Sequence, residues 1–532
     1  WSRVKGGAPI GKAIEKIIED FDFSTPYKSV VPLLEVKAMI LELEDEHWKS
    51  VKKKEVDTLI LNCLGIELQL NSNIPYGVLG EDLQIKVLVN NPSPLSVSLN
   101  DIQWKDQSYD INKRLNTNQL FNKSFKTKVS GSISSPYWLI QKGNQGMYTT
   151  DKTELIGAAK SPAAYIVELN FSIEGTMLKI RLPLQFRRTD PVRGEVVTPF
   201  HILPQGSLQL EAPVFLFAVG ESRRVKVSVK NLGPSIEGTL KLESLGSWEF
   251  NPKSIQVAIK GKGNQSDYYF DIKAPLESTV GYLKPLLQTQ TKTFGASLKE
   301  IVYNHIPEQY LVSPAQSKVV ALNLKTGVEK VAYIEGAGDN IPQSLTALGI
   351  EVEKLKAKNI TFEKLNPFDS VILGIRAFNI EDALAYKNKI LWKYVAAGGN
   401  LLIQYNTSRR LKTKELTPFT LNLSRDRVSN ESAEAHIINP KHPIFNHPNK
   451  ITAQDFEDWV QERGLYFPNQ WDPQFTPLLQ MNDVGESPKK GSLLVANYGK
   501  GRIVYTGLSF FRQLPAGVPG AYRLFFNLIA KQ

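Results

Sequence analysis

The spacing of apolar positions changes twice along the chain, and each change predicts a different kind of structure. Residues 1–64 carry apolar side chains at three- and four-residue intervals, the spacing of helices with one buried face. From residue 65 apolar and polar positions alternate, as in the half-buried strand expected over residues 83–89. From residue 328 short continuous apolar runs alternate with helical spacing. We therefore expect a multidomain chain with a helical segment, an antiparallel β region and an α/β region in that order.

The β region contains an internal repeat. Residues 80–91 and 220–231 match at one constant offset, each with a Gly-Glu pair, an alternating strand and a terminal Asn. Two copies of one unit predict two related antiparallel β-sandwiches in tandem. We place the first sandwich at residues 65–200 and the second at 201–327.

The last region, residues 328–532, has the order strand, helix, strand, strand, helix, strand between positions 330 and 405. Apolar runs without alternation predict strands buried on both faces, as in a doubly wound, flavodoxin-like parallel sheet. A long insertion rich in Asn, Pro and His reaches to about Pro488. A hairpin over residues 492–506 and a last helix over residues 521–530 are expected to complete the domain.

Ligands of such sheets sit beyond the carboxyl ends of the strands. Polar residues that follow three of the expected strands, together with a tryptophan of the insertion, are therefore our candidate ligand-binding residues. They are Glu335, Asp339, Arg376, Asn379, Asn406, Ser408, Arg409 and Trp471. Paired arginines beside amides suit an anionic or polyhydroxyl ligand, and a structural network of salt bridges is the alternative explanation.

Motifs for cofactor binding and catalysis are incomplete. Gly336-Ala-Gly338 lies between a strand and a helix, but Ile341 occupies the third glycine position of a dinucleotide-binding turn, so we interpret it as a tight turn. No Gly-x-Ser-x-Gly motif is present, since Gly507-Leu-Ser509-Phe-Phe511 lacks the second glycine. Cys63 stands in a mostly apolar run and is expected to be a buried structural thiol. No catalytic residue is predicted.

Metal binding is not predicted either. The possible ligands fall in a proline-rich stretch and lack the i, i+4 spacing of a helical site. They are His436, His442, His447, Asp455 and Glu457.

Composition sets limits on the partners. The 532 residues carry a formal net charge of +11, but the basic residues form small scattered groups without a nucleic-acid-binding motif. A solvated surface explains them, and attraction to acidic glycans stays open. No apolar run approaches the ~18 residues of a membrane span. One cysteine excludes an intrachain disulfide.

Several stretches together resemble the long C-terminal region of large bacterial PIG-L (LmbE-like) deacetylases, over essentially the whole chain. The stretches are Phe21-Asp-Phe-Ser-Thr-Pro26, Asp190-Pro-Val-Arg-Gly-Glu195, Tyr333-Ile-Glu-Gly-Ala-Gly-Asp339, Gly374-Ile-Arg-Ala-Phe-Asn379, Gly398-Gly-Asn-Leu-Leu-Ile-Gln-Tyr-Asn406, and Tyr505-Thr-Gly-Leu-Ser-Phe-Phe511 leading to Leu514-Pro-Ala-Gly-Val-Pro-Gly520.

The resemblance implies that a zinc-dependent N-acetylglucosaminyl deacetylase domain precedes residues 1–64 in the parent protein. Its His-Pro-Asp-Asp signature is missing here, where only His442-Pro443 and His447-Pro448 are similar, so no zinc ligand or catalytic residue carries over. The last domain is similar to the class I amidotransferase and ThuA-like fold. The nucleophilic cysteine of amidotransferases has no counterpart at Tyr405-Asn406-Thr407.

From this resemblance we expect a non-catalytic accessory region without a cofactor of its own. It would position the upstream deacetylase domain, bind glycan, and work in the periplasm or outside the cell. An independent hydrolase or transferase with its site at the strand ends, and a purely structural scaffold, are the alternatives.

Overall fold

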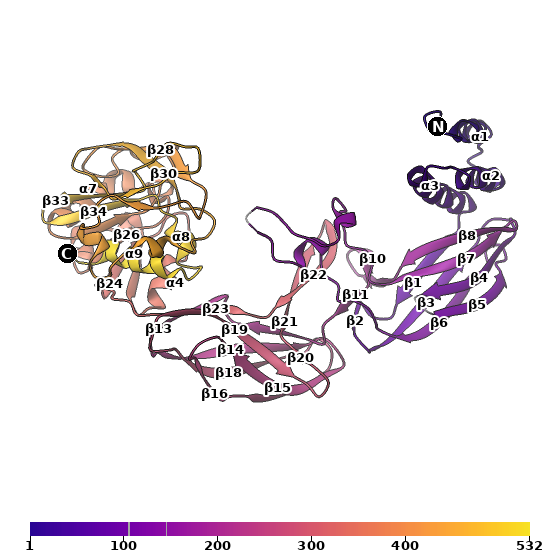
Figure 1. Ribbon diagram of the computed structural model, residues 1–532, viewed down its shortest axis with the longest axis horizontal. Helices are drawn as coiled ribbons and strands as arrows, with labels where there is room; N and C mark the ends of the chain where they lie inside the picture. Colours follow the sequence, from indigo (N-terminus) through magenta and orange to yellow (C-terminus); the bar gives the residue numbers. More distant parts are fainter. Residues whose placement is uncertain (105–106, 145, 532) are drawn as a thin grey trace.

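The computed structural model describes residues 1–104, 107–144 and 146–531. The chain is elongated, with three helices at one end, sheets in the middle and a unit of mixed helices and strands at the other end (Figure 1). Strands in several sheets dominate, which confirms the predicted multidomain chain with β-sandwich content. Among the described helices, none combines the length and the apolar composition that crossing a bilayer requires.

The helical segment consists of α1 (Gly7–Glu19), α2 (Val30–Leu41) and α3 (Glu46–Leu64). Helix α3 begins where Asp45 accepts a hydrogen bond from the Trp48 backbone N–H, and ends at Gly65 in the left-handed conformation. The buried apolar residues of these helices share one core with the first sandwich. The helices therefore extend the core of their neighbour, because three short helices alone would bury little apolar area.

The first sandwich stacks two antiparallel-rich sheets. One sheet has the order β10-β9-β1-β3-β6 and the other β5-β4-β7-β8. Their bounds are β1 (Glu67–Ser72), β3 (Asp82–Asn90), β6 (Phe121–Lys128), β9 (Gln185–Asp190), β10 (Gly194–Pro199), β4 (Val97–Trp104), β5 (Gln107–Arg114), β7 (Ile166–Ile173) and β8 (Thr176–Pro183). Alternate residues of β3 face the core, as the sequence pattern predicted.

The second sandwich pairs β12-β14-β18-β16 with β13-β23-β19-β15-β17. The bounds are β12 (Gly206–Leu210), β14 (Ser222–Asn231), β16 (Glu249–Asn251), β18 (Gln265–Lys273), β13 (Val214–Ala218), β15 (Ser235–Glu243), β17 (Ile255–Lys260), β19 (Thr279–Gln288) and β23 (Ser317–Leu322). A long hairpin, β21 (Ala296–Tyr303) and β22 (Ile306–Pro314), rises from it towards β10 of the first sandwich (Figure 1).

The sequence repeat corresponds to the same hydrogen-bonded turns in both sandwiches. Glu81 accepts a hydrogen bond from the Val78 N–H at 3.0 Å, and Glu221 accepts one from the Ala218 N–H at 2.8 Å. Further along, the side chain of Asn91 closes the turn after β3, and fully buried Asn231 closes the turn after β14. The repeated residues therefore fix the two ends of equivalent strands.

Residues after 328 form a seven-stranded sheet with the order β25-β24-β26-β27-β34-β33-β31. The first five strands are parallel to one another, β33 is antiparallel to β34, and β31 is antiparallel to β33. The bounds are β24 (Lys330–Ile334), β25 (Glu351–Leu355), β26 (Ser370–Leu373), β27 (Asn400–Ile403), β31 (Thr476–Pro477), β33 (Leu493–Tyr498) and β34 (Gly501–Thr506).

Both faces of this sheet are covered. Val331 and Tyr333 belong to a core that includes helix α9 (Pro519–Ile529), whereas Ala332 and Ile334 belong to a core that includes helix α7 (Leu384–Ala396). Burial on two sides explains why the strands read as continuous apolar runs. The α9 core also contains residues of β23, so this unit packs on the second sandwich.

The long insertion contains more regular structure than we expected. It forms a two-stranded ribbon of β28 (Leu421–Val428) and β30 (Gly464–Trp471), and a short pair of β29 (His436–Ile437) with β32 (Leu479–Gln480). Residues of ribbon β28–β30 line a cavity together with candidate residues that follow β26 and β27.

Candidate functional site

A strained strand-to-helix turn follows β26. Arg376 has φ 57°, in the left-handed region that arginine rarely adopts, and the short helix α6 (Ala377–Ile380) begins directly after it. Its backbone N–H donates to the Tyr405 carbonyl at 2.8 Å, which ties the turn to the end of the next strand. The Nε atom of Arg376 is buried and has no hydrogen-bond partner among the described residues. Strain and an orphan donor at one residue are features that cluster at functional sites.

The turn at Arg376 bears on whether this domain displays a catalytic nucleophile. From the sequence we took Tyr405-Asn406-Thr407 as the turn comparable to that of a nucleophile. In the structure the left-handed residue of a sharp strand-to-helix turn, the usual place of an exposed nucleophile, is Arg376. A guanidinium stays protonated and is not a nucleophile.

Two candidate amides hold this turn in place. Asn406 is fully buried, accepts a hydrogen bond from the Phe378 N–H at 2.9 Å and donates to the Gln404 carbonyl. Asn379 donates to the carbonyls of Thr407 and Arg409 and accepts from the Thr407 N–H at 2.9 Å. Their hydrogen-bonding groups are occupied by the backbone, so they position the loops on both sides of the site.

A cavity of about 310 Å³ opens at this edge, and we call it the arginine cavity. Its lining residues come from the ends of β26 and β27 and from the ribbon β28–β30. They are Arg376, Asn379, Ile380, Thr407, Ser408, Arg409, Arg410, Arg425 and Tyr466. Three predicted residues besides Asn379 meet here: Arg376, Ser408 and Arg409.

The charge of the arginine cavity is not compensated within the described chain. Among the described residues, four arginines and no carboxylate line it. None of the ion pairs formed by the described residues includes Arg376, Arg409, Arg410 or Arg425. The network of salt bridges that we considered as an alternative is thus not what brings these arginines together. Arg425 and Tyr466 were not among the predicted residues, although the Arg-Asp-Arg run at 425–427 is a visible signal.

Glu335 and Asp339 lie outside the arginine cavity. Glu335 forms an exposed ion pair with Lys354 at 2.8 Å. Asp339 accepts hydrogen bonds from the buried Tyr333 hydroxyl at 2.6 Å and from the Ile341 N–H at 3.1 Å. Burial, together with the neighbouring Asp339 carboxylate, raises the pKa of Tyr333 well above its usual value. Asp339 therefore organises its own turn.

Replacing Tyr333 by phenylalanine tests this structural role of Asp339. We expect a loss of about 1.5–3 kcal/mol of stability, because a hydrogen bond to a charged carboxylate is removed. Hydrogen exchange in β24 and the following turn measures it. Tyr394→Phe, which removes a bond to the neutral Phe368 carbonyl, is the matched control and should cost only about 0.5–1.5 kcal/mol. Equal losses in the two variants would contradict a charged partner for Tyr333.

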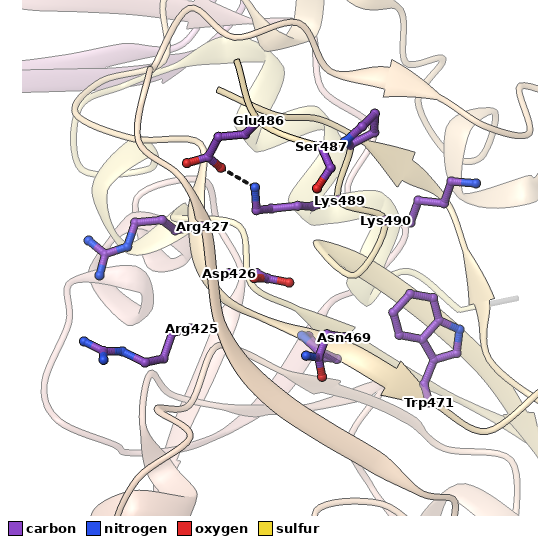
Figure 2. A pocket seen from close by; sticks show the side chains of 11 residues that line it. Arg425, Asp426, Arg427, Asn469, Trp471, Glu486, Ser487, Lys489 and Lys490 are labelled. Carbon is purple, nitrogen blue, oxygen red and sulfur yellow. Dashed lines mark hydrogen bonds and ion pairs between the residues drawn. The ribbon is translucent and has the colours of Figure 1, made fainter. Parts of the chain in front are cut away.

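Trp471 lies in a second, larger hollow of about 710 Å³ beside the arginine cavity, which we call the tryptophan hollow (Figure 2). Its lining residues are Arg425, Asp426, Arg427, Pro468, Asn469, Trp471, Glu486, Ser487, Pro488, Lys489 and Lys490. Arg425 lines both hollows. In Figure 2 Arg425 and Arg427 lie on one side, Trp471 and Lys490 on the other, with Asn469 between them.

Among the described residues, no group of three or more His, Cys, Asp or Glu side chains is arranged to hold a metal ion. His442 accepts a hydrogen bond from the Ile444 N–H at 3.2 Å and caps a turn. Asp455 is buried in a capping box with Thr452 and pairs with Arg523. These residues have local structural partners.

Comparisons with known proteins give little further guidance. No family model and no curated protein matches the chain. Among solved structures, the native alpha-2-macroglobulin of Escherichia coli is 13% identical, with a TM-score of 0.18, over 48% of this chain and 17% of that one. The exo-beta-1,4-mannosidase Op5Man5 from Opitutaceae bacterium strain TAV5 is 12% identical, with a TM-score of 0.23, over 38% of this chain and 35% of that one.

A family 123 glycoside hydrolase from Clostridium perfringens is 8% identical, with a TM-score of 0.14, over 38% of each chain. This chain thus spans well under two thirds of each of these proteins. Likeness at this level carries no argument about ligand or activity. The class that the fold and site define is a multidomain, β-rich protein with an arginine-lined cavity at the edge of a mostly parallel sheet.

Proposed function

We propose that this chain is a non-catalytic accessory region that binds glycan, and that its α/β unit recognises an anionic group at the arginine cavity. The observation that carries the proposal is the meeting of four arginines, without a carboxylate partner in the described chain, around one cavity. The cavity lies beyond the carboxyl ends of parallel strands, where such sheets bind ligands.

Arginine suits this task for physical reasons. A guanidinium presents its N–H groups in a rigid fork that matches carboxylate, sulfate or phosphate with two parallel hydrogen bonds. The main chain of Arg376 is fixed by its hydrogen bond to Tyr405 and by the amides of Asn379 and Asn406. An anion that enters also relieves the mutual repulsion of the four cations and can satisfy the orphan Nε atom of Arg376.

The lining of the cavity supports binding over catalysis. Its hydroxyl groups belong to Thr407, Ser408 and Tyr466, and no histidine or carboxylate lines the cavity to act as their base. Arg376 occupies the turn where a nucleophile would be displayed. This disfavours the alternative of an independent hydrolase or transferase at this site.

The choice of a glycan as ligand rests on the resemblance to the trailing region of PIG-L deacetylases. In this proposal the chain accompanies a glycan-directed deacetylase domain of the same protein, outside the cytoplasm. The arginine cavity supplies what a pure scaffold would not need, namely uncompensated positive charge in a concave site.

Calorimetric titration of the full chain with galacturonate and with neutral N-acetylglucosamine tests the proposal. We expect binding of the uronate that weakens with added salt, and no measurable binding of the neutral sugar. Arg376→Gln and Arg409→Gln should each weaken uronate binding by about tenfold or more, since a charge-assisted hydrogen bond contributes about 1.5–3 kcal/mol.

Arg3→Gln is the matched control, because Arg3 is an exposed arginine at the far end of the molecule. It should leave the affinity unchanged. Equal binding of neutral and acidic sugars, or no effect of Arg376→Gln and Arg409→Gln, would overturn the proposed site. Release of acetate from acetylated amino sugars by this chain alone would overturn its non-catalytic role.

A further inference from the structure

The arginine cavity and the tryptophan hollow are neighbouring parts of one surface. Arg425 belongs to the lining of both and is the side chain at their boundary. Each volume, about 310 and about 710 Å³, falls within the usual range of ~300–1,000 Å³ for sites that hold small molecules. A ligand long enough to pass Arg425 would therefore contact both.

The ribbon β28–β30 is built to place Arg425 at this boundary. The pairing of the two strands passes from Leu423 opposite Pro468 directly to Asp426 opposite Phe467, so Ser424 and Arg425 are extra residues in a bulge. The Ser424 hydroxyl stabilises the bulge by donating to the Phe467 carbonyl at 2.7 Å and accepting from the Asp426 N–H at 2.9 Å. Bulges of this kind redirect side chains and are common beside functional sites.

The tryptophan hollow combines positive charge with one exposed aromatic face. Four cationic and two acidic side chains line it, and Glu486 is already paired with Lys489. In the described chain Arg425, Arg427 and Lys490 form no ion pair. The half-buried indole of Trp471 lies on the same side of the hollow as Lys490, across from Arg425 and Arg427 (Figure 2). The C–H face of a sugar ring packs on such an indole while the cations bind acidic substituents.

We infer that the arginine cavity and the tryptophan hollow form one continuous groove for an anionic oligosaccharide of more than one unit. One acidic group of the oligosaccharide binds at Arg376 and Arg409, and another sugar unit packs on Trp471 beside Lys490, with Arg427 on the opposite side of the hollow. This inference rests on the proposed function of the arginine cavity and adds the length of the ligand and the role of the ribbon.

A single-stranded nucleic acid is also an anionic polymer with flat rings, but the groove fits it less well. Proteins that bind single strands stack successive bases on several aromatic rings. Among the described residues, the two hollows together have two aromatic lining residues, Trp471 and Tyr466, and the Tyr466 ring is already stacked on Tyr405. We therefore commit to an acidic oligosaccharide and use an oligonucleotide as a comparison.

The test is a calorimetric titration of the full chain with galacturonate oligomers from monomer to hexamer. We expect the affinity to rise with length until the groove is filled. Trp471→Ala should weaken hexamer binding by about tenfold, because one stacked ring contributes about 1–3 kcal/mol, and should leave monomer binding unchanged. Arg409→Gln should weaken binding of both.

A second variant, Arg427→Gln combined with Lys490→Gln, keeps the test valid if loss of the half-buried indole disturbs the fold. Both residues are exposed and without ion pairs. This variant should also weaken the hexamer selectively. Trp48→Ala, which removes a tryptophan of the helical segment that is 39% exposed, is the control and should change neither affinity.

The outcomes separate this inference from the proposed function. An affinity that does not rise with length, or a loss in the Trp471 and Arg427/Lys490 variants that is equal for monomer and hexamer, overturns the inference alone. No loss of monomer binding in Arg409→Gln overturns the proposed function. A single-stranded oligonucleotide that binds more tightly than the hexamer, and loses affinity in Trp471→Ala, overturns the assignment to an oligosaccharide.

Discussion

Replacing Arg502 by methionine is expected to lower the free energy of unfolding of the α/β unit by about 3–5 kcal/mol. Arg502 is only 3% exposed and has no acidic partner. Its guanidinium donates at 3.0 Å to the side-chain oxygen of Asn400 and to the carbonyls of Leu528 and Ala530. Those carbonyls end helix α9, where no further helical N–H is available to bond them.

The reason for a loss of this size is that two acceptors, the Asn400 side-chain oxygen and the Ala530 carbonyl, are orphaned at once, whereas the Leu528 carbonyl keeps its hydrogen bond from the Asn400 side chain. Methionine fills much of the same volume but donates no hydrogen bond, and each buried acceptor left unsatisfied costs about 1–3 kcal/mol. Burial already lowers the pKa of Arg502 to about 10, so the protein holds the charge there against a desolvation penalty. The hydrogen bonds to the helix end must offset that penalty.

Urea denaturation followed by hydrogen exchange in α9 measures the effect of Arg502→Met. Arg427→Met is the matched control, since Arg427 is exposed and forms no ion pair among the described residues. It should change stability by less than about 0.5 kcal/mol. A similar small change for Arg502→Met would show that water or a shift of α9 satisfies the carbonyls instead.

The periodicity of the sequence predicted much of the architecture because burial imposes it. In β3 and β14 one face meets the core, so alternation marks the strand. In β24 both faces are covered, so the strand is a continuous apolar run. Neither pattern marks β28 and β30, whose pairing is interrupted by bulges and by Pro468, so no strand was predicted within the insertion.

The sequence predicted only those site residues that the order of the parallel strands brings to the same edge of the sheet. Arg376, Ser408 and Arg409 follow neighbouring parallel strands and therefore meet. Arg425 and Tyr466 come from the ribbon, whose position over the edge depends on tertiary packing. Asp339 follows a parallel strand as well, but its carboxylate already accepts hydrogen bonds from the Tyr333 hydroxyl and from the backbone of its own turn.

The turn at Arg376 shows a different limit. A position with a left-handed backbone conformation is usually occupied by glycine, since other residues adopt this conformation at a cost of about 1–3 kcal/mol. Here Arg376 adopts it. Gly336 lies across the turn, and its lack of a side chain serves a different purpose, close packing. A Cβ atom on Gly336 would lie 2.0 Å from the Ile375 carbonyl oxygen. The Gly-Ala-Gly segment thus serves close packing of two strand ends, in agreement with its interpretation as a tight turn.

Acidification from neutral pH to about pH 4 is expected to destabilise the junction of the two sandwiches by up to about 3 kcal/mol through His201. His201 begins β11 (His201–Leu203), which pairs with β2 (Tyr76–Val78). Its ring packs at 4.9 Å against Tyr310 of the hairpin strand β22, and its buried Nε2 has no partner. Burial lowers the pKa of His201 from 6.5 to about 4.

The sign follows from which state binds the proton. Between pH 6.5 and about 4 the unfolded chain protonates this histidine while the folded junction keeps it neutral, so stability falls as pH falls through this window. Hydrogen exchange in β11 and β22 as a function of pH measures the effect. His201→Phe keeps the ring contact and should remove this part of the pH dependence, whereas His305→Phe, at an exposed position of the same hairpin, should retain it. The acidic side chains near the junction, such as Glu308, are present in all three proteins, so their contributions cancel in the comparison. An unchanged pH dependence in His201→Phe would show that other groups make the junction sensitive to acid.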